Sequence, residues 1–244
     1  MSSLLCDKKI LILGATGRIG RSVSIRLAKC GHKLILHGRN EDALCLLMNE
    51  LSDLGADVCK IQADIEVPQQ ASSLLKDAAS FYQGFSGVIN CIGIFDDFSL
   101  EKNSCQFYDR IFSVNFSLIA QIIAGSIEFM PPSGGVIISL SSLAGKYPLP
   151  HSPMYSASKF AIFGFFESLY ERFKRKGIKV CVVGTGQVST LITKDESLDA
   201  LEIPVDDVAA LVEFIVGFSS VSRSCLSEVL VKPVDRRWIY DERV

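Results

Sequence analysis

The chain has 244 residues, enough for one large domain or two small ones with a buried core. Hydrophobic residues make up 48% of the sequence, which excludes a disordered chain. The 25 basic and 27 acidic side chains give a formal net charge of −2, so no electrostatic feature favours a nucleic-acid partner or an anionic membrane surface.

The predicted elements alternate along the chain. Short runs that are apolar throughout predict strands at 9–15, 33–38, 58–63, 87–93, 135–142, 179–185 and 228–234. Such runs are typical of strands covered on both faces of a parallel sheet. Segments of helical period lie between them, at 19–30, 41–54, 68–82, 105–130, 155–176 and 205–218. We therefore predict an α/β, doubly wound, seven-stranded parallel sheet with helices on both faces.

No linker or internal repeat interrupts this series. We expect residues 1–244 to form a single domain, with 235–244 as a candidate C-terminal tail. The N-terminal apolar run is short and ends in glycines, and no stretch approaches the roughly 18 continuous apolar residues of a membrane span. We therefore expect neither a secretory signal nor a membrane partner.

Eight cysteines are scattered along the chain without a Cys-x-x-Cys pair, and the three histidines do not cluster with them. A metal site is therefore not expected. Several of the cysteines lie in apolar runs such as "VINCIG", where a free thiol acts as a small hydrophobe. A reduced, cytoplasmic compartment fits this usage best.

Three glycines follow the first predicted strand, in "ILILGATGRIG". Gly14, Gly17 and Gly20 permit a tight turn and the close approach of the main chain to a pyrophosphate, which the N–H groups of the following helix would bind. Their position at the first strand–helix junction predicts a dinucleotide site, and the alternative is a glycine-rich turn without a ligand.

The second predicted strand ends in "LILHGRN". In dinucleotide folds an acidic residue at this place binds the ribose 2′-hydroxyl, but here Gly38 and Arg39 stand there, with no carboxylate to repel a 2′-phosphate. A guanidinium is well suited to bind that phosphate, and Arg18 in the glycine turn adds a second one. Either arginine alone is more often a solvated residue, but together they favour NADP(H) over NAD(H).

A tyrosine and a lysine lie four residues apart in "MYSASK", so Tyr155 and Lys159 share one face of a predicted helix. A cation about 4 Å away, at an effective dielectric near 20, favours a phenolate by roughly 4 kcal/mol. We therefore expect Lys159 to lower the pKa of Tyr155 towards the range useful for proton transfer. Ser142 ends a predicted strand, where its hydroxyl would meet a substrate carbonyl, whereas Ser141 is expected to face elsewhere. Taken alone, Tyr-x-x-x-Lys usually means a lysine stem beside an aromatic ring.

With these motifs the chain resembles a short-chain dehydrogenase/reductase of the compact, single-domain type, over nearly its whole length. "SSLAGKYPLPHSPMYSASK" is similar to the Ser…Tyr-x-x-x-Lys segment of that family, and "SVNFSL" to the segment with its catalytic asparagine. "VINCIG" resembles the Asn-Asn-Ala-Gly segment, "QADI" the segment that contacts adenine, and "GTGQVST" the segment that meets the nicotinamide amide.

The resemblance implies a Rossmann-like fold and assigns roles residue by residue. Tyr155 would donate the proton to the developing alkoxide, Ser142 would hydrogen-bond the same oxygen, Lys159 would hold the nicotinamide ribose, and Asn115 would hold a water that relays protons. The predicted catalytic residues are Asn115, Ser142, Tyr155 and Lys159. The predicted cofactor-binding residues are Gly14, Thr16, Gly17, Arg18, Ile19, Gly20, Arg39, Asp64, Ile65, Asn90, Gly93, Tyr155, Lys159, Gly186, Val188 and Thr190.

Some positions depart from the family pattern. The glycine spacing is that of the extended branch, but few residues follow the seventh predicted strand, so no room is left for the substrate domain of that branch. Cys91 and Ile92 replace an asparagine and an alanine, and Thr185 replaces a proline, which is expected to loosen the following loop.

The resemblance implies hydride transfer between a nicotinamide and a carbonyl or alcohol carbon of a small, moderately apolar substrate. Phe95, Phe98, Leu143, Pro148, Leu149, Leu191 and Ile192 are the expected pocket lining. Two alternatives remain: a non-catalytic dinucleotide-binding sensor or scaffold, and a 3-oxoacyl-carrier-protein reductase. Lys102 and Arg110 would meet an acidic carrier, although nearby acids argue against that role. The family and the apolar helix after Phe160 also favour a homodimer or homotetramer.

Overall fold

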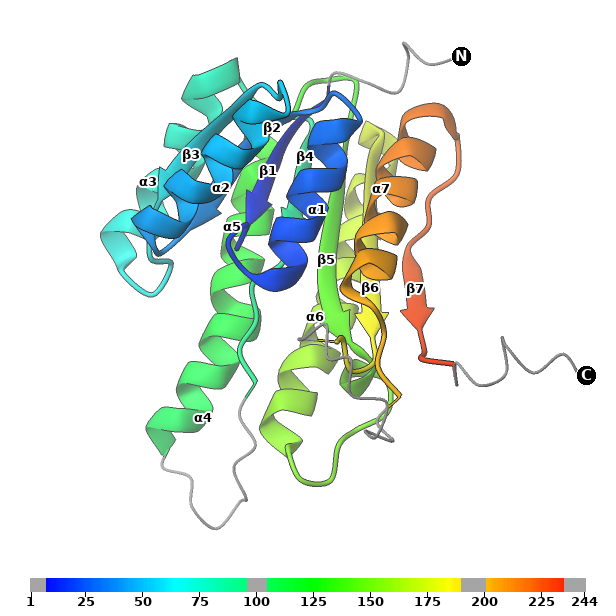
Figure 1. The fold of residues 1–244 in the computed structure, drawn as a ribbon. Coiled ribbons are helices and arrows are strands. Elements are labelled where there is room, and N and C mark those ends of the chain that lie inside the picture. Colours follow the sequence, from blue (N-terminus) through cyan, green and yellow to red (C-terminus); the bar gives the residue numbers. More distant parts are fainter. Residues whose placement is uncertain (1–7, 96–104, 190–200, 235–244) are drawn as a thin grey trace, which may run out of the picture.

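The computed structural model describes residues 8–95, 105–189 and 201–234 (Figure 1). Its strands form one seven-stranded sheet in the order β3-β2-β1-β4-β5-β6-β7, and every neighbouring pair is parallel. The predicted fold class is confirmed. The strands are β1 (Lys9–Leu13), β2 (Lys33–Gly38), β3 (Val58–Gln62), β4 (Gly87–Asn90), β5 (Gly135–Ser142), β6 (Ile178–Thr185) and β7 (Glu228–Val231).

Helices cover both faces of the sheet (Figure 1). One core cluster joins a sheet face to α1 (Arg18–Lys29), α2 (Glu41–Asp53) and α7 (Val205–Val221). The other cluster joins the opposite face to α3 (Pro68–Tyr82), α5 (Leu118–Ser126) and α6 (Pro153–Phe173). The central strands are therefore covered on both faces, which explains why their sequences are apolar throughout and do not alternate.

The predicted helix 105–130 is a series of shorter pieces. It consists of α4 (Cys105–Phe112), a π-helical turn η2 (Ser113–Ser117), α5, and a 3₁₀ turn η3 (Ile127–Phe129). A π turn inserts one residue into the helical repeat and is common at functional sites. Asn115 lies in the middle of this turn.

The same run Cys105–Phe129 has the length and composition of a membrane span, with a mean hydropathy of 1.5 in its most apolar stretch. The expectation that no stretch approaches this test was wrong, because it counted only uninterrupted apolar residues. The run contacts the rest of the fold along one side: α4 contacts α6, and α5 contacts α3 and β4. Within the fold, 39% of that apolar stretch is buried.

Two further 3₁₀ turns, η4 (Leu143–Gly145) and η5 (Lys174–Lys176), follow β5 and α6. Helix α6 begins at Pro153, a residue suited to the first turn because its missing N–H needs no partner there. Tyr155 and Lys159 therefore lie in the first two turns of α6, beside the end of β5.

Candidate functional site

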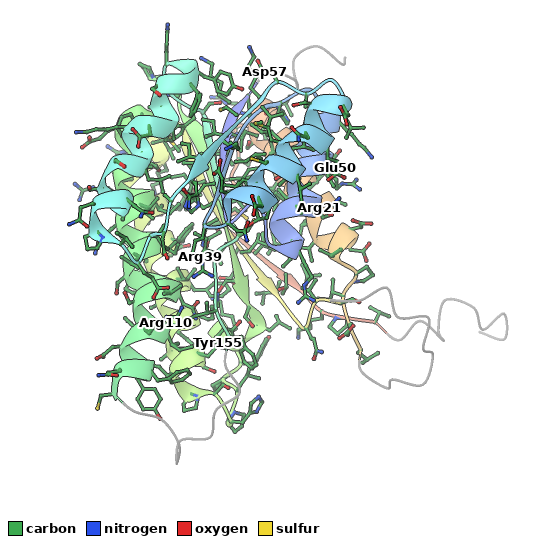
Figure 2. The ribbon with its side chains drawn as sticks, turned by 60° about the vertical axis from the view of Figure 1, so that its left-hand side comes forward. Arg21, Arg39, Glu50, Asp57, Arg110 and Tyr155 are labelled. Carbon is green, nitrogen blue, oxygen red and sulfur yellow. The ribbon has the colours of Figure 1, made fainter. Side chains whose placement is uncertain are left out.

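All seven strands are parallel, so their carboxyl ends lie along one edge of the sheet, at the bottom of the view in Figure 1. The glycine turn, Arg39, Asn90 and Ser142 follow or end these strands. In Figure 2, Arg39, Arg110 and Tyr155 lie in the lower half of the view, far from Asp57, which precedes β3. The fold thus brings most of the predicted site residues to the edge where open α/β sheets bind ligands.

The glycine turn has the geometry of an anion cradle. Gly14 has φ +75°, which favours glycine, and a Cβ there would lie 3.0 Å from Ile92 Cγ1. A Cβ on Gly20 would lie 2.2 Å from the Gly14 carbonyl oxygen. Gly17 caps α1 without a side chain to accept hydrogen bonds from the first turn, and that turn holds no acidic residue. These features fit a pyrophosphate at a helix N-terminus.

His37 is a buried residue beneath this turn that the sequence reasoning missed. Its Nδ1 accepts a hydrogen bond from Gly14 N at 3.3 Å, and its Nε2 lies 3.1 Å from the carbonyl oxygen of Ala63. Burial lowers the pKa of His37 to about 4, so the ring is neutral and donates from Nε2. The signal in the sequence was a polar residue inside the apolar strand "LILHG".

Gly38 does not offer an open place for a side chain. A Cβ there would lie 3.0 Å from Thr16 Oγ1, so Gly38 lets the glycine turn pack onto the end of β2. Arg39 follows and is exposed, and Arg18 is exposed in the first turn of α1. Ile19 is half-buried and packs against the core.

The expectation that no carboxylate is available to repel a 2′-phosphate considered only the end of the second strand and missed Glu66. Glu66, from the loop after β3, places Oε2 3.7 Å from Arg39 Nη1. The same carboxylate forms two closer bonds with Arg110 of α4, at 2.9 Å and 3.0 Å. The sequence could not show this contact, because the three residues come from separate elements.

The loop after β3 is held by its own polar groups. Asp64 Oδ1 accepts a hydrogen bond from Glu66 N at 3.0 Å, and Asp64 N donates to Gln70 Oε1 at 2.6 Å. The side chain of Ile65 is buried in the core, so a cofactor contact by this residue would use its main chain.

Tyr155, Ser142 and Lys159 come together as predicted. Lys159 Nζ lies 5.4 Å from the centre of the Tyr155 ring, and the Ser142 hydroxyl acts on the phenol so as to lower its pKa. Ser142 Oγ also accepts a hydrogen bond from Ala144 N at 3.1 Å, which fixes the hydroxyl at the start of η4. Ser141 lies on the buried side, and its Oγ has no hydrogen-bond partner in the described residues.

The expected lowering of the Tyr155 pKa is contradicted. Burial raises the pKa of this phenol, and the hydrogen bond with Ser142 opposes that rise only in part. Burial also lowers the pKa of Lys159 to about 8, and no acidic residue in the described segments forms an ion pair with its ammonium. Burial disfavours the charged form of both groups, so it moves the two pKa values in opposite directions.

A second Tyr-x-x-x-Lys pair lies at the other end of α6. Lys174 Nζ is 5.7 Å from the centre of the Tyr170 ring and hydrogen-bonds Glu171. This bond raises the pKa of Lys174, the opposite direction from Lys159. The same spacing thus occurs in two environments, since Lys159 is buried near the carboxyl edge of the sheet whereas Lys174 is exposed and paired with Glu171.

Asn115 joins the loop after β4 to α6. Its Oδ1 accepts from Ile94 N at 2.8 Å, and its Nδ2 donates to Ile94 O at 2.9 Å and to Ser158 Oγ at 3.2 Å. Gly93 lies beside it, where a Cβ would be 3.0 Å from Lys159 Nζ and 3.6 Å from Asn115 Oδ1. Glycine at 93 thus makes room for the lysine ammonium.

Asn90 connects two strands. It donates from Nδ2 to Ser139 Oγ of β5 at 3.0 Å and accepts from Ile92 N at 3.0 Å. The replacements Cys91 and Ile92 pack as part of the core clusters, and burial raises the pKa of Cys91 to about 12. The thiol is therefore neutral and acts as an apolar group.

The segment after β6 approaches the same edge. Gly186 N donates to Val231 O, and Val188 pairs with Ile203 in an isolated bridge. Thr185 is buried and donates from Oγ1 to Ser141 O at 3.4 Å, which anchors the start of this segment where loosening was expected. Thr190, Leu191 and Ile192 lie outside the described residues, as do Phe98 and Lys102.

The phenol of Tyr155 has an aromatic neighbour. Phe95 meets it edge-on, with the ring centres 4.9 Å apart, and 54% of the Phe95 surface is exposed. Leu143 and Leu149 of the expected lining are half-buried, whereas Pro148 is exposed. An open hollow of about 510 Å³ lies on the outer side, lined by residues of α4, η2 and α6 including Tyr108, Phe112 and Met154.

Comparisons with known proteins agree with this geometry. The family model described as short chain dehydrogenase matches residues 8–200. The chain belongs to the short-chain dehydrogenase family. A hydroxysteroid 11-beta-dehydrogenase 1-like protein of Xenopus tropicalis is 29% identical over 85% of this chain and 75% of its own length. An uncharacterized oxidoreductase of Staphylococcus aureus is 26% identical over 95% of this chain and 100% of its own.

Solved structures share the fold. A dehydrogenase/reductase from Sinorhizobium meliloti superimposes with a TM-score of 0.85 at 22% identity, covering 95% of this chain and 96% of that one. A short chain dehydrogenase from Burkholderia cenocepacia, solved in complex with NADP, gives 0.83 at 24% identity, covering 94% and 98%. As a short-chain dehydrogenase, the chain is an oxidoreductase of a family that uses a nicotinamide cofactor and acts on alcohol or carbonyl groups of small molecules.

Proposed function

We propose that this short-chain dehydrogenase is an NADP(H)-dependent oxidoreductase that transfers a hydride between nicotinamide and a carbonyl or alcohol carbon of a small, moderately apolar substrate. The observation that carries the proposal is the Tyr155 ring, whose centre lies 5.4 Å from Lys159 Nζ and whose phenol is influenced by the Ser142 hydroxyl. For the second pair, Tyr170 and Lys174, no contact with a serine at a strand end is found among the described residues. A non-catalytic sensor would have no need for this arrangement.

The directions of the pKa changes favour reduction of a carbonyl. Because burial raises the pKa of Tyr155, the phenol carries its proton at neutral pH and is ready to donate it to a developing alkoxide. Ser142, fixed by Ala144 N, would donate a second hydrogen bond to the same oxygen. Lys159 would stabilise the phenolate left behind. Asn115 would hold a water for reprotonation, in a role supported by its position beside Gly93 and Lys159.

The glycine turn would bind the cofactor pyrophosphate, because its main chain is open and no acid lies in the first turn of α1. When bound, a nicotinamide cofactor supplies or accepts the hydride. Arg39 would bind a 2′-phosphate, since it is exposed at the end of β2 and makes only a distant ion pair. Asp64, Asn90, Gly186, Val188 and Thr190 complete the proposed cofactor site.

Substrate preference is proposed from the lining. Phe95 against the Tyr155 ring, with Leu143 and Leu149 nearby in the chain segments that border the site, favours an apolar carbonyl compound over a charged one. Arg110 is paired with Glu66 and is not a free docking residue for an acidic carrier protein. We therefore place an acyl-carrier reductase second.

We also propose that the chain acts as one domain in the cytoplasm. The seven cysteines in the described segments are all free, which suits a reducing compartment.

The activity is tested by following NADPH oxidation with a panel of ketones, aldehydes and acyl thioesters. With the best substrate found, Tyr155→Phe should abolish turnover and leave NADPH affinity nearly unchanged, because the ring is kept and only the proton is lost. Tyr170→Phe, the same change in the second Tyr-x-x-x-Lys pair of α6, should leave turnover intact. Retention of more than a few per cent of activity by Tyr155→Phe would show that another group donates the proton.

Cofactor preference is tested separately by titration. Two charge-assisted contacts of a 2′-phosphate, partly screened by solvent, should give about a hundredfold preference for NADPH over NADH. Arg39→Ala should raise the NADPH dissociation constant about tenfold and leave NADH nearly unchanged. Equal affinities of the unmodified protein for both cofactors would reject the NADP(H) assignment.

A further inference from the structure

Two arginines from distant parts of the chain share one carboxylate at the site edge. Arg39 follows β2, Glu66 lies in the loop after β3, and Arg110 lies in α4. Figure 2 shows Arg39 and Arg110 in the same part of the molecule as Tyr155. The three side chains are partly exposed: 60% of the Arg39 side-chain surface is accessible, 29% of that of Glu66 and 54% of that of Arg110.

The two arginines hold the carboxylate unequally. Arg110 donates from Nε to Glu66 Oε1 at 2.9 Å and from Nη2 to Oε2 at 3.0 Å, a bidentate pair that occupies both oxygens. Arg39 approaches only Oε2, at 3.7 Å, which is beyond hydrogen-bond distance. Arg39 therefore keeps its donors available, although a carboxylate lies within reach.

The main chain around both residues is fixed, so a competition between the arginines is decided by side-chain rotation. Asp64 Oδ1 accepts from Glu66 N at 3.0 Å, and Gln62 Nε2 donates to Arg39 O at 3.2 Å. If Arg110 were removed, Glu66 would need only a change of side-chain conformation to pair closely with Arg39. Such a pair would put a negative charge where a 2′-phosphate is to bind.

We propose that Arg110 is a positioning residue for cofactor discrimination: by binding both oxygens of Glu66, it prevents this carboxylate from neutralising Arg39 and repelling a 2′-phosphate. The inference rests on the proposed NADP(H) preference and adds a residue to it. Arg110 acts through Glu66 and does not contact the phosphate itself.

The test is a double-mutant cycle read by ligand binding. Arg110→Gln, Glu66→Gln and the double variant are titrated with NADPH and NADH by fluorescence, and with adenosine 2′,5′-bisphosphate and 5′-AMP, which differ only in the 2′-phosphate. Arg110→Gln should weaken NADPH and the bisphosphate about threefold to fivefold, as expected when an exposed ion pair changes partner. NADH and 5′-AMP should change little.

The double variant separates this mechanism from a direct contact. If Arg110 acts through Glu66, removing both groups should restore bisphosphate affinity to the level of Glu66→Gln alone, because no carboxylate is left to compete. If Arg110 touched the phosphate, the double variant would stay weak, and the inference would be overturned. Restoration of affinity also shows that the variants are folded.

A matched control is available in the Arg21–Glu50 pair. Arg21 binds both oxygens of Glu50 at 2.7 Å with similar exposure, and Figure 2 shows the pair in the upper part of the view, away from Arg39. Arg21→Gln should leave the ratio of bisphosphate to 5′-AMP affinity unchanged. If Arg21→Gln weakened bisphosphate binding as much as Arg110→Gln does, the loss would be explained by net charge alone, and the inference would be overturned. Equal wild-type affinities for NADPH and NADH would overturn the proposed preference together with this inference. A wild-type preference without coupling in the cycle would overturn the inference alone.

Discussion

Replacing Lys159 with methionine should stabilise the protein without cofactor while it abolishes turnover. The lysine is 4% exposed, and burial lowers its pKa from 10.5 to about 8. At neutral pH the folded protein therefore holds an ammonium in an environment that disfavours it. Methionine has a similar unbranched stem, a good helix propensity and no charge, so it fills the same space without this cost.

The pKa gives the size of the effect. A folded-state pKa lowered from 10.5 to about 8 corresponds to about 3 kcal/mol of unfolding free energy at pH 7. The sign follows from proton binding: between the two pKa values the unfolded chain binds more protons at this lysine, so the stability of the unmodified protein rises with pH. The advantage of Lys159→Met should therefore fall from about 3 kcal/mol at pH 7 to about 1 kcal/mol at pH 10.

Urea unfolding of both proteins at pH 7 and at pH 10, followed by circular dichroism, measures this difference. Other titrating groups are common to both proteins and cancel in the comparison. Lys174→Met is the matched control, since this lysine is exposed and paired with Glu171, and the change should bring no stabilisation. The desolvation argument would be refuted if Lys159→Met had a lower unfolding free energy than the unmodified protein. It would also be refuted if the gain in unfolding free energy were the same at pH 7 and at pH 10.

Four further predictions concern the residues around the site. Gly20→Ala should weaken NADPH binding at least tenfold in a titration, because the new Cβ would lie 2.2 Å from the Gly14 carbonyl oxygen. Gly164→Ala, whose Cβ would have no atom within 4 Å, should bind NADPH normally and gain up to about 1 kcal/mol of helix stability. Asn115→Ala should lose about 2–3 kcal/mol in urea unfolding and most of kcat, because Ile94 N and O are left without their partner; unchanged stability would contradict this. His37→Gln should remove a pH dependence of stability. Because the pKa of His37 is lowered from 6.5 to about 4, the unfolding free energy of the unmodified protein should fall by up to about 3 kcal/mol as the pH decreases from 6.5 to 4. Parallel curves of unfolding free energy against pH for the two proteins would contradict this. Light scattering should show a dimer or tetramer, and a strict monomer at micromolar concentration would reject that expectation.

The fold could be predicted because its signals are local. Each central strand is a short apolar run and each helix has its own period, so the alternation in the sequence is the alternation in space. The break at Ser113–Ser117 could not be predicted, because the apolar period runs through it without a Gly or Pro, and the hydrogen bond of Asn115 with Ile94 joins residues 21 positions apart. Nor could the carboxylate beside Arg39, which comes from a different loop.

The site motifs were local too, but their energetics were not. Spacing placed Tyr155 and Lys159 on one face of α6, and it placed Tyr170 and Lys174 in the same relation. Burial then decides the outcome, since it moves the pKa of Lys159 down while an exposed partner moves that of Lys174 up. Burial follows from the packing of α6 onto the end of β5 and from the glycine at 93, both tertiary features.

The polar groups that burial leaves uncompensated lie at one edge of the sheet. Lys159 is buried without an acidic partner in the described segments, and Ser141 Oγ, also in those segments, has no hydrogen-bond partner. The two hydrophobic clusters, one on each side of the sheet, stabilise the fold and offset the free energy lost by burying these polar groups. For Lys159 this cost fits the proposed proton-transfer role, because perturbed ionisable groups cluster at functional sites; Ser141 has no such role. Asn90 and Asn115, in contrast, have hydrogen-bonded side-chain amides and hold the loop after β4, which fits the proposed division between positioning residues and the reacting pair Tyr155 and Lys159.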